Sequence, residues 1–392
     1  MSQNEGCTEV VGPNILYFGP YAWREGMGGS ARLRNMLDVL GKLQANIHLI
    51  SYLSEKKFRM THKRVSDYLN TLTVHVPRSL PKLFKLFALL PIFMYGLRYI
   101  KKSNIILAHG PGIVYGLPAL ILAKTFSKPL LIDLTDSRDP DTPGFIYSRV
   151  LKNSSVVFAV SRYLVEVARE AGCRNVVYAP GFIDADIFQN NASERAKIRK
   201  KLNIGSNDVV IGYAGHFSPI EGLSFLLKAF KSLSKRYENI KLVLLGGRSV
   251  PGSDNIMQLA NEPDLKEKVI LIPPQPYESM PAYLSAFDIA CSPKIDCAEN
   301  RAADPIRVYE YMSVGLPTVA TAVGSTANVI ENGRDGFLAK PGDEDDLERI
   351  LEHVIQNLDS LQEVRRKARE KVIKDYTQAV ILKKIENVLK EL

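Results

Sequence analysis

The sequence contains few cysteines and no feature of a secreted protein. Its four cysteines, Cys7, Cys173, Cys291 and Cys297, are scattered and show no Cys-x-x-Cys spacing. This pattern argues against a disulfide framework or a zinc site and favours reduced thiols in a reducing compartment. Residues 1–13 are polar and contain no apolar segment of the kind that a signal peptide requires. We therefore expect a cytoplasmic protein.

The chain also lacks low-complexity segments and internal repeats. Of its 392 residues, 46% are hydrophobic and 24% are charged, as in soluble globular proteins. No repeat with a period of a few tens of residues is visible, and no Ser/His/Asp or Cys/His arrangement for nucleophilic catalysis can be read. A chain of this length is too long for one ordinary core, so two domains are expected.

Short apolar, β-rich segments alternate with helical patterns along nearly the whole chain, which is typical of parallel α/β architecture. In the first half the pattern predicts strands at 14–19, 47–52, 105–108, 130–134 and 156–160, and helices at 29–43, 80–102, 117–126 and 162–171. In the second half it predicts strands at 209–214, 241–245, 269–272, 289–291 and 318–320, and helices at 221–236, 280–285, 305–314 and 343–357.

A polar segment, 184–207, separates the two series and shows no strand pattern, so it is the predicted linker. We thus expect two doubly wound halves that face each other. Ligands of such sheets bind beyond the carboxyl ends of the strands. The expected site is therefore a cleft between the two halves.

The second half carries the most specific pattern. Residues 305–320 read PIRVYEYMSVGLPTVA, followed by AVGS at 322–325, ENGRDGFL at 331–338 and PGD at 341–343. In this order and spacing, these motifs resemble the donor-site signature of family 4 glycosyltransferases. Matching segments extend the resemblance over nearly the whole chain: VYAPGFID at 177–184, GYAG at 212–215 and EGMGG at 25–29.

The resemblance implies the GT-B fold, in which two Rossmann-like domains face each other across a cleft. It places the acceptor in an N-terminal domain, 1–183, and a nucleotide-sugar donor in a C-terminal domain, 184–375. Residues 376–392 resemble the helix that crosses back to the first domain. The transfer would retain the anomeric configuration, with the leaving phosphate helping to take the acceptor's proton.

Glu310 is the expected ribose-binding residue, at the start of a helix just beyond a strand. A carboxylate accepts two hydrogen bonds from a vicinal diol, and in the family this group takes the ribose hydroxyls of the donor. Backbone amides at the helix N-terminus suit a diphosphate, and the Arg307 guanidinium adds a positive charge there. An ordinary surface Glu and Arg would be the alternative. The further donor-binding residues that we expect are Gly28, Gly29, Gly215, His216, Arg248, Pro274 and Val308.

The glycines at positions 26, 28 and 29 follow the first strand and open a helix, so they predict an anion-binding loop. The full dinucleotide fingerprint, with an acid about twenty residues later, is absent, which argues against a nicotinamide cofactor. By resemblance, this loop closes over the donor phosphates and the acceptor.

Polar residues also follow two strands of the first half. His109 comes after strand 105–108, and by resemblance it lies close to the transferred sugar, although a lone histidine is often structural. Asp136 and Arg138 end the next strand and are acceptor-side candidates. Asp136 would equally suit a helix or turn cap.

The sequence departs from the family at an acid and at a basic pair. Eight positions before Glu310, where the family has a second glutamate, this chain has Ala302, with Glu299 and Asp304 as candidate substitutes. The two cations that usually neutralise the diphosphate correspond to His216 and Glu221. We therefore expect Arg307, Arg248 and His216 to supply the positive charge that faces the diphosphate.

The motif Asp184-Ala185-Asp186 is similar to the metal-binding Asp-x-Asp of the other glycosyltransferase fold, but it falls in the linker. We therefore expect no catalytic metal and no other cofactor, and no nucleic-acid partner. Two alternatives stay open. One is a nucleotide-sugar epimerase, and the other is a catalytically weakened subunit that binds a glycan or a partner transferase.

Basic residues are concentrated in one part of the first half. Residues 55–102 contain eleven Lys/Arg and two acids, so this stretch carries the whole excess of +9. Within it, residues 83–97 are apolar but too short for a membrane span and interrupted by Pro91. A basic, apolar segment suits the surface of an anionic leaflet, and a buried helix is the alternative. We expect residues 79–102 to bind the membrane surface, and the resemblance then implies a polyprenyl-linked or other glycan acceptor.

Overall fold

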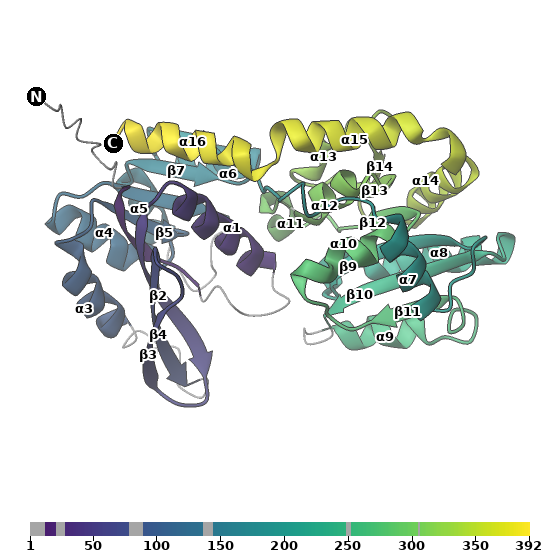
Figure 1. The fold of residues 1–392 in the computed structure, drawn as a ribbon, viewed down its shortest axis with the longest axis horizontal. Helices are drawn as coiled ribbons and strands as arrows, with labels where there is room; N and C mark the ends of the chain where they lie inside the picture. The colour runs from purple at the N-terminus through teal and green to yellow at the C-terminus, as the bar shows by residue number, and fades with distance from the viewer. Residues whose placement is uncertain (1–11, 21–27, 78–88, 136–143, 248–251, 305) are drawn as a thin grey trace, which may run out of the picture.

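The computed structural model describes residues 12–20, 28–77, 89–135, 144–247, 252–304 and 306–392. Two α/β domains lie side by side, and two consecutive long helices, α15 (Gln362–Asp375) and α16 (Gln378–Lys390), run along one side of both (Figure 1). The architecture of two doubly wound parallel sheets is the one that the sequence predicted.

The N-terminal sheet has eight strands in the order β3-β4-β2-β1-β5-β6-β7-β8, all parallel except the β3–β4 pair. Its strands are β1 (Asn14–Phe18), β2 (Asn46–Glu55), β3 (Arg59–Arg64), β4 (Leu69–Pro77), β5 (Ile105–His109), β6 (Leu130–Leu134), β7 (Val156–Ala159) and β8 (Val176–Tyr178). Because β1 lies between β2 and β5, the strand order reverses there, and this is the point at which such sheets bind ligands.

Helices cover both faces of this sheet: α1 (Gly28–Lys42), α3 (Leu89–Ile100), α4 (Gly116–Thr125), α5 (Gly144–Lys152) and α6 (Arg162–Glu170). One core packs α1 and α16 against the sheet through Leu33, Leu37, Ile381 and Ile385. The other core lies under α3, α4, α5 and α6. The parallel strands are buried on both faces, which explains their nearly continuous apolar sequences.

The C-terminal sheet has six parallel strands in the order β11-β10-β9-β12-β13-β14. They are β9 (Val209–His216), β10 (Ile240–Gly247), β11 (Val269–Ile272), β12 (Ile289–Ser292), β13 (Thr318–Thr321) and β14 (Phe337–Ala339). Here the order reverses between β9 and β12.

The longer helices of this domain are α7 (Ala192–Lys201), α8 (Leu223–Arg236), α9 (Ser253–Ala260), α12 (Ile306–Val314) and α14 (Glu344–Gln356). Shorter segments are η2 (Pro219–Glu221), η3 (Tyr277–Ser279), α10 (Met280–Ser285), α11 (Ala298–Ala302), α13 (Thr326–Val329) and η4 (Leu358–Ser360). One core packs α8, α9 and α14 on the sheet, and another packs α7, α10, α12 and α15. Asp343 caps α14 and three acids fill its first turn, as the sequence predicted.

Several features differ from the sequence prediction. The first sheet is extended by β3 and β4, which no pattern indicated. The predicted linker contains α7, which belongs to the C-terminal domain because Arg195 and Arg199 both form ion pairs with Asp288. The connection between the domains is therefore shorter than 184–207. The predicted helix at 80–102 is observed as α3 from Leu89 onward, and its first part lies outside the described residues.

The two chain crossings between the domains are hydrogen-bonded to each other. The backbone amide of Ile183 donates to Tyr376, and that of Gln378 donates back to Ile183. The first crossing is further fixed by Asp304, whose carboxylate accepts bonds from the Gly181 amide and the Tyr309 hydroxyl. These contacts join the two crossings, and we call this region the hinge.

Candidate functional site

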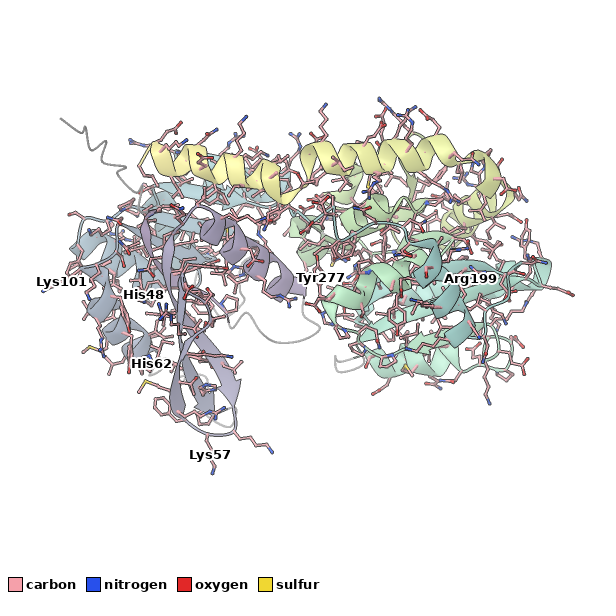
Figure 2. All side chains as sticks on the ribbon, viewed as in Figure 1. His48, Lys57, His62, Lys101, Arg199 and Tyr277 are labelled. Atoms are coloured by element: carbon pink, nitrogen blue, oxygen red, sulfur yellow. The ribbon has the colours of Figure 1, made fainter. Side chains whose placement is uncertain are left out.

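The carboxyl ends of the C-terminal strands gather the polar residues that the sequence singled out. His216 ends β9, Gly247 ends β10, and α12 begins shortly before β13. Across from them, α1 begins at Gly28 and Gly29 and places Arg34 against Tyr277 of η3, with the guanidinium 5.6 Å from the ring centre. Figure 2 shows Tyr277 on the side of the C-terminal domain that faces the N-terminal domain. The described members of the predicted donor set that belong to the C-terminal domain thus lie at the expected edge of its sheet.

Arg307 is paired within the protein. Its Nη1 donates to Glu221 Oε2 at 2.6 Å and to the Tyr213 hydroxyl at 2.7 Å, and its guanidinium lies 4.9 Å from the centre of the Tyr213 ring. Only 14% of the side chain is exposed. The sequence predicted a positive charge near the phosphates, and the structure adds that a buried carboxylate offsets part of it.

Gly215 is required by this packing. A Cβ atom at position 215 would lie 2.7 Å from Cζ of Arg307 and 2.8 Å from the Tyr213 hydroxyl. Only glycine lets the guanidinium lie against the backbone at the end of β9. The glycine that the sequence assigned to the donor site therefore also sets the place of Arg307.

His216 lies at the end of β9, near Arg307. It is half-buried, and burial and the nearby Arg307 charge lower the pKa of its imidazole below the ordinary value. The ring is therefore mostly neutral near pH 7. The role of His216 in the donor site stays a prediction.

Glu310 is the fifth residue of α12, one turn further into the helix than the sequence interpretation placed it. Only 8% of the residue is exposed. Burial raises the pKa of its carboxyl to about 7, against the opposing effects of Arg307 and of a hydrogen bond from Tyr277. The site thus holds a carboxyl that is poised between its two protonation states at neutral pH. Tyr277 was missed at the sequence level, where only its nearness to Pro274 could have indicated it.

The other predicted donor residues differ in how a ligand could reach them. The Val308 side chain is buried, so only its backbone is available to a ligand, and Pro274 is exposed in the loop that follows β11. Gly28 and Gly29 are the first residues of α1, whose N-terminus carries the positive end of the helix dipole. Arg248 lies outside the described residues.

His109 belongs to a buried network on the acceptor side. Its Nδ1 lies 3.5 Å from Asp133 Oδ2, and its Nε2 lies 3.2 Å from the Thr135 hydroxyl. Arg32 on α1 completes the network, with Nη2 2.6 Å from Asp133 Oδ1. Burial alone would raise the pKa of Asp133, but Arg32 and His109 hold it at about 2. Asp133 is therefore ionised and orients the imidazole of His109.

The remaining acceptor-side and acidic candidates are less defined. Asp136 and Arg138 lie outside the described residues. Of the two proposed substitutes for the missing glutamate, Asp304 is bound in the hinge, and Glu299 is exposed in the first turn of α11. Ala302 itself is fully buried. Within the described residues, no three His, Cys, Asp or Glu side chains are grouped so that they could hold a metal ion.

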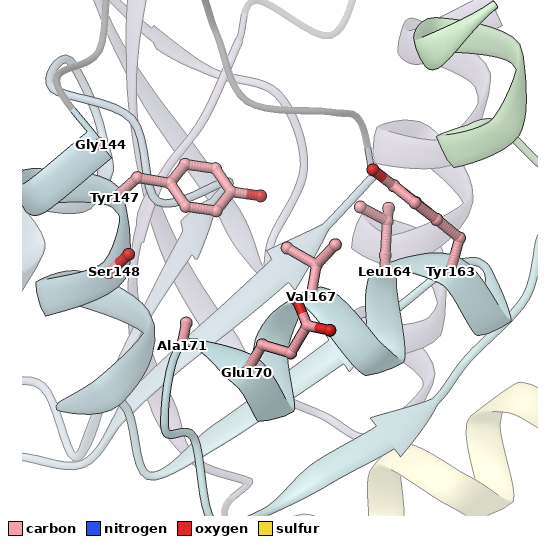
Figure 3. A pocket seen from close by; sticks show the side chains of 8 residues that line it. All are labelled: Gly144, Tyr147, Ser148, Tyr163, Leu164, Val167, Glu170 and Ala171. Carbon is pink, nitrogen blue, oxygen red and sulfur yellow. The ribbon is translucent and has the colours of Figure 1, made fainter.

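One cavity lies between the domains and another lies in the N-terminal domain. The cavity between the domains has a volume of about 570 Å³ and is lined by Tyr277, Arg34, Asp38, Tyr68, Asp184 and Glu278, among others. The other cavity, of about 410 Å³, lies between α5 and α6 (Figure 3). It is lined by Tyr147, Ser148, Tyr163, Leu164, Val167 and Glu170. The first adjoins the donor-side residues, and the second belongs to the N-terminal domain alone.

Residues 194–371 match the model of a family described as glycosyl transferases group 1. Over the whole molecule, sucrose-phosphate synthase from Thermosynechococcus elongatus superposes with a TM-score of 0.81 and 17% identity, covering 96% of this chain and 98% of that one. The fold is GT-B. HepE of Anabaena, in complex with UDP-glucose, superposes on this GT-B chain with a TM-score of 0.74 and 19% identity, covering 97% and 100% of the two chains.

Curated proteins are similar to part of this chain. The D-inositol 3-phosphate glycosyltransferase of Stackebrandtia nassauensis is 24% identical over 62% of this chain and 56% of its own length. That of Mycobacterium sp. (strain KMS) is 25% identical over 62% of this chain and 54% of its own length. The chain thus spans about half the length of the curated relatives that it matches. The comparisons show the GT-B fold, and the assignment to family 4 stays a prediction.

Proposed function

We propose that this GT-B chain is a retaining glycosyltransferase that moves a sugar from a nucleotide-sugar donor to a glycan or lipid-linked acceptor. The observation that carries the proposal is the buried Glu310 carboxyl beside Arg307, at the carboxyl edge of a domain that matches the group 1 family. The UDP-glucose complex of the structural neighbour HepE supports a nucleotide-sugar donor. The comparisons favour transfer over the epimerase alternative, since the family and the curated relatives are glycosyltransferases.

In this proposal the C-terminal domain, 184–375, holds the donor. Glu310 accepts the two ribose hydroxyls, while Arg307 and the backbone amides of the first turn of α12, near Val308, face the diphosphate. Gly215, His216, Arg248 and Pro274 line the same edge, and the N-terminus of α1, at Gly28 and Gly29, approaches the phosphates from the other domain.

The N-terminal domain, 1–183, holds the acceptor, and 376–392 cross back to it. His109 lies next to the transferred sugar, and Asp136 and Arg138 contact the acceptor. The acceptor oxygen bonds to the anomeric carbon as the bond to the diphosphate breaks, and its proton passes to the leaving phosphate. Positioning and electrostatic stabilisation of that phosphate supply the catalysis, so we propose that no metal or other cofactor takes part.

The test is a panel of nucleotide sugars, assayed for hydrolysis and for transfer. We expect the wild-type chain to release nucleotide from at least one of them, and Glu310→Gln to lose this activity while staying folded. Binding without turnover in every case would instead support the weakened-subunit alternative. The control is Glu238→Gln, which removes an exposed carboxylate of the same domain.

We further propose that the enzyme works at the cytoplasmic face of the membrane. The β2–β3–β4 extension projects from the N-terminal domain, with Lys57 at its tip (Figure 2). Phe58 and Met60 are 55% and 43% exposed, and Leu90 and Met94 on the adjacent α3 are 62% and 55% exposed.

These two elements form one surface, because the His62 imidazole lies 3.3 Å from the Tyr95 hydroxyl of α3. The same hairpin carries the exposed basic residues Lys56, Lys57, Arg59, Lys63 and Arg64. Exposed apolar groups within a basic surround suit an anionic leaflet. Compared with the predicted segment 79–102, the surface proposed here keeps α3 and adds the β3 hairpin. Among the described helices, none has the length and apolar character that crossing a membrane requires.

Sedimentation with anionic and with neutral vesicles tests the membrane proposal. We expect binding to anionic vesicles at low salt, weaker binding at high salt, and loss of binding in Lys57→Glu combined with Phe58→Ser. The matched control is Lys235→Glu, which makes the same charge change on an exposed residue of the other domain. Equal sedimentation with neutral vesicles, or none with either, would contradict the proposal.

A further inference from the structure

Three charged side chains from three separate segments meet beyond the ends of β9 and β12. Glu221 ends η2, Lys294 follows β12, and Arg307 is in the first turn of α12. Arg307 Nη1 lies 2.6 Å from Glu221 Oε2, and Lys294 Nζ lies 3.7 Å from Glu221 Oε1. Glu221 and Lys294 are buried, with 6% and 9% of the residue exposed.

The two loops that carry Glu221 and Lys294 pack closely on each other. Gly222, with a φ of +71°, lies so close to the next segment that a Cβ atom there would be 1.8 Å from the carbonyl oxygen of Pro293. The Asn300 side chain ties the two loops, since its Nδ2 donates to the carbonyls of Ile220 and Ile295. Its Oδ1 accepts a 2.8 Å bond from Lys294 Nζ.

Among Glu221, Lys294 and Arg307 there are two basic groups for one carboxylate. Burial lowers the pKa of Lys294, against the opposing effect of Glu221, and the Glu310 carboxyl also lies near Arg307. His216 beside them is mostly neutral. Burial would raise the pKa of Glu221, but the two cations lower it, so the carboxylate is ionised at neutral pH. A buried charge without a counter-ion is costly. Two basic groups around one carboxylate at the ligand-binding edge of a sheet therefore favour an anionic ligand.

Both cations also have donors left for such a ligand. Among the described residues, Arg307 donates only through Nη1, which leaves Nη2 and Nε. Lys294 Nζ makes one hydrogen bond, to Asn300, among the same residues, and an ammonium has three donors. A phosphate group accepts several such bonds.

We propose that Lys294 is the second cation of the donor's diphosphate site, and that Glu221 is a positioning residue that holds Lys294 and Arg307 toward it. The inference rests on the proposed nucleotide-sugar donor. Where the family resemblance expects a basic pair, this chain has His216 and Glu221. In this proposal Lys294, in the neighbouring loop, supplies the second positive charge from a different position in the sequence.

Calorimetric titration with nucleotides that differ by one phosphate tests this assignment. The wild-type chain is first titrated with UDP, ADP and GDP, and the tightest of these is compared with its monophosphate. A charge-assisted bond contributes about 1.5–3 kcal/mol, so we expect Lys294→Met to weaken the diphosphate about tenfold to a hundredfold. The monophosphate, which lacks the second phosphate, should lose less.

Two further variants separate binding from a purely structural role. Glu221→Gln combined with Lys294→Met removes the pair without leaving an unpaired charge, and should still bind the diphosphate weakly. Glu221→Lys combined with Lys294→Ser moves the cation to the position that the family resemblance indicates, and should restore the affinity. Lys235→Met is the matched control.

The outcomes are distinguishable from failure of the proposed function. Wild-type-like diphosphate affinity in both Lys294→Met and the double neutral variant would overturn the role of Lys294 and leave the proposed donor site standing. Absence of binding of any of the three nucleotides to the wild-type chain would overturn both.

Discussion

In each domain a buried carboxylate lies between two basic side chains near the end of the sheet. In the N-terminal domain Asp133 lies between Arg32 and His109, and in the C-terminal domain Glu221 lies between Arg307 and Lys294. The first cluster has one guanidinium, Arg32, and one imidazole, His109, for its carboxylate, whereas the second has two basic groups, Arg307 and Lys294. In the account that we propose, the first cluster orients an imidazole and the second attracts a diphosphate.

The largest effect is expected when Asp133 of the N-terminal cluster is replaced. Asp133→Asn leaves Arg32 buried without its partner, and breaking a buried pair in this way costs about 3–5 kcal/mol. Urea denaturation of the variant should show this loss of unfolding free energy. Asp133→Asn combined with Arg32→Met should recover most of it. An unchanged midpoint in the single variant would show that Arg32 has another counter-ion.

The cluster of Glu221, Lys294 and Arg307 is tested by replacing Arg307. In Arg307→Ala, Glu221 would cancel Lys294, and the positive charge that faces the leaving phosphate would be lost. We expect the barrier to rise by about 2–4 kcal/mol, as for other oxyanion-stabilising groups, and by more than in Arg248→Ala. Steady-state turnover of both variants checks this. A near-native rate in Arg307→Ala would mean that the phosphate is neutralised elsewhere.

Glu310 should make stability depend on pH. Burial raises its pKa to about 7, so the folded chain holds this proton more tightly than the unfolded one. Stability from this group is present below the unfolded pKa and is lost as pH rises through 7, by about 3 kcal/mol in all. Glu310→Gln removes the effect, so its stability relative to wild type should rise by about that amount between pH 4.5 and pH 8. Denaturant unfolding at the two pH values measures it, and a constant difference would contradict the assignment.

The smallest effect is expected for a substitution of His109. His109→Asn keeps a polar side chain beside Asp133 and should lower turnover about tenfold, or about 1.4 kcal/mol, with little change in donor affinity. Comparing kcat and KM for the donor separates the two. A change confined to donor KM would place His109 on the donor side of the cleft.

The sequence predicted the sheets well because buried parallel strands are short apolar runs that alternate with helices. It missed β3, since all six residues of Arg59–Arg64 are exposed and four of them are basic or histidine. It missed α7, since Ala192–Lys201 is mostly charged and shows no apolar stripe. Neither segment has a buried face that would appear in the sequence as a periodic apolar pattern.

The site was predictable where local motifs carry it and not where distant segments meet. Glu310, Arg307 and Gly215 follow from the motifs of the second half. Asp133 is paired with a residue 101 positions away, and Lys294 joins Glu221 only because two loops pack on each other. No spacing in the sequence records such pairs, so the charge balance of both clusters required the structure.

Titration of the Glu310→Ala variant tests the central claim most directly. The nucleotide sugar that the wild-type chain binds most tightly is titrated by calorimetry into wild type and variant, with circular dichroism to verify folding. The account predicts that donor binding is abolished in a folded protein, because the ribose hydroxyls lose the carboxylate that accepts them. Unchanged affinity in the folded variant would remove Glu310 from the site and contradict the account.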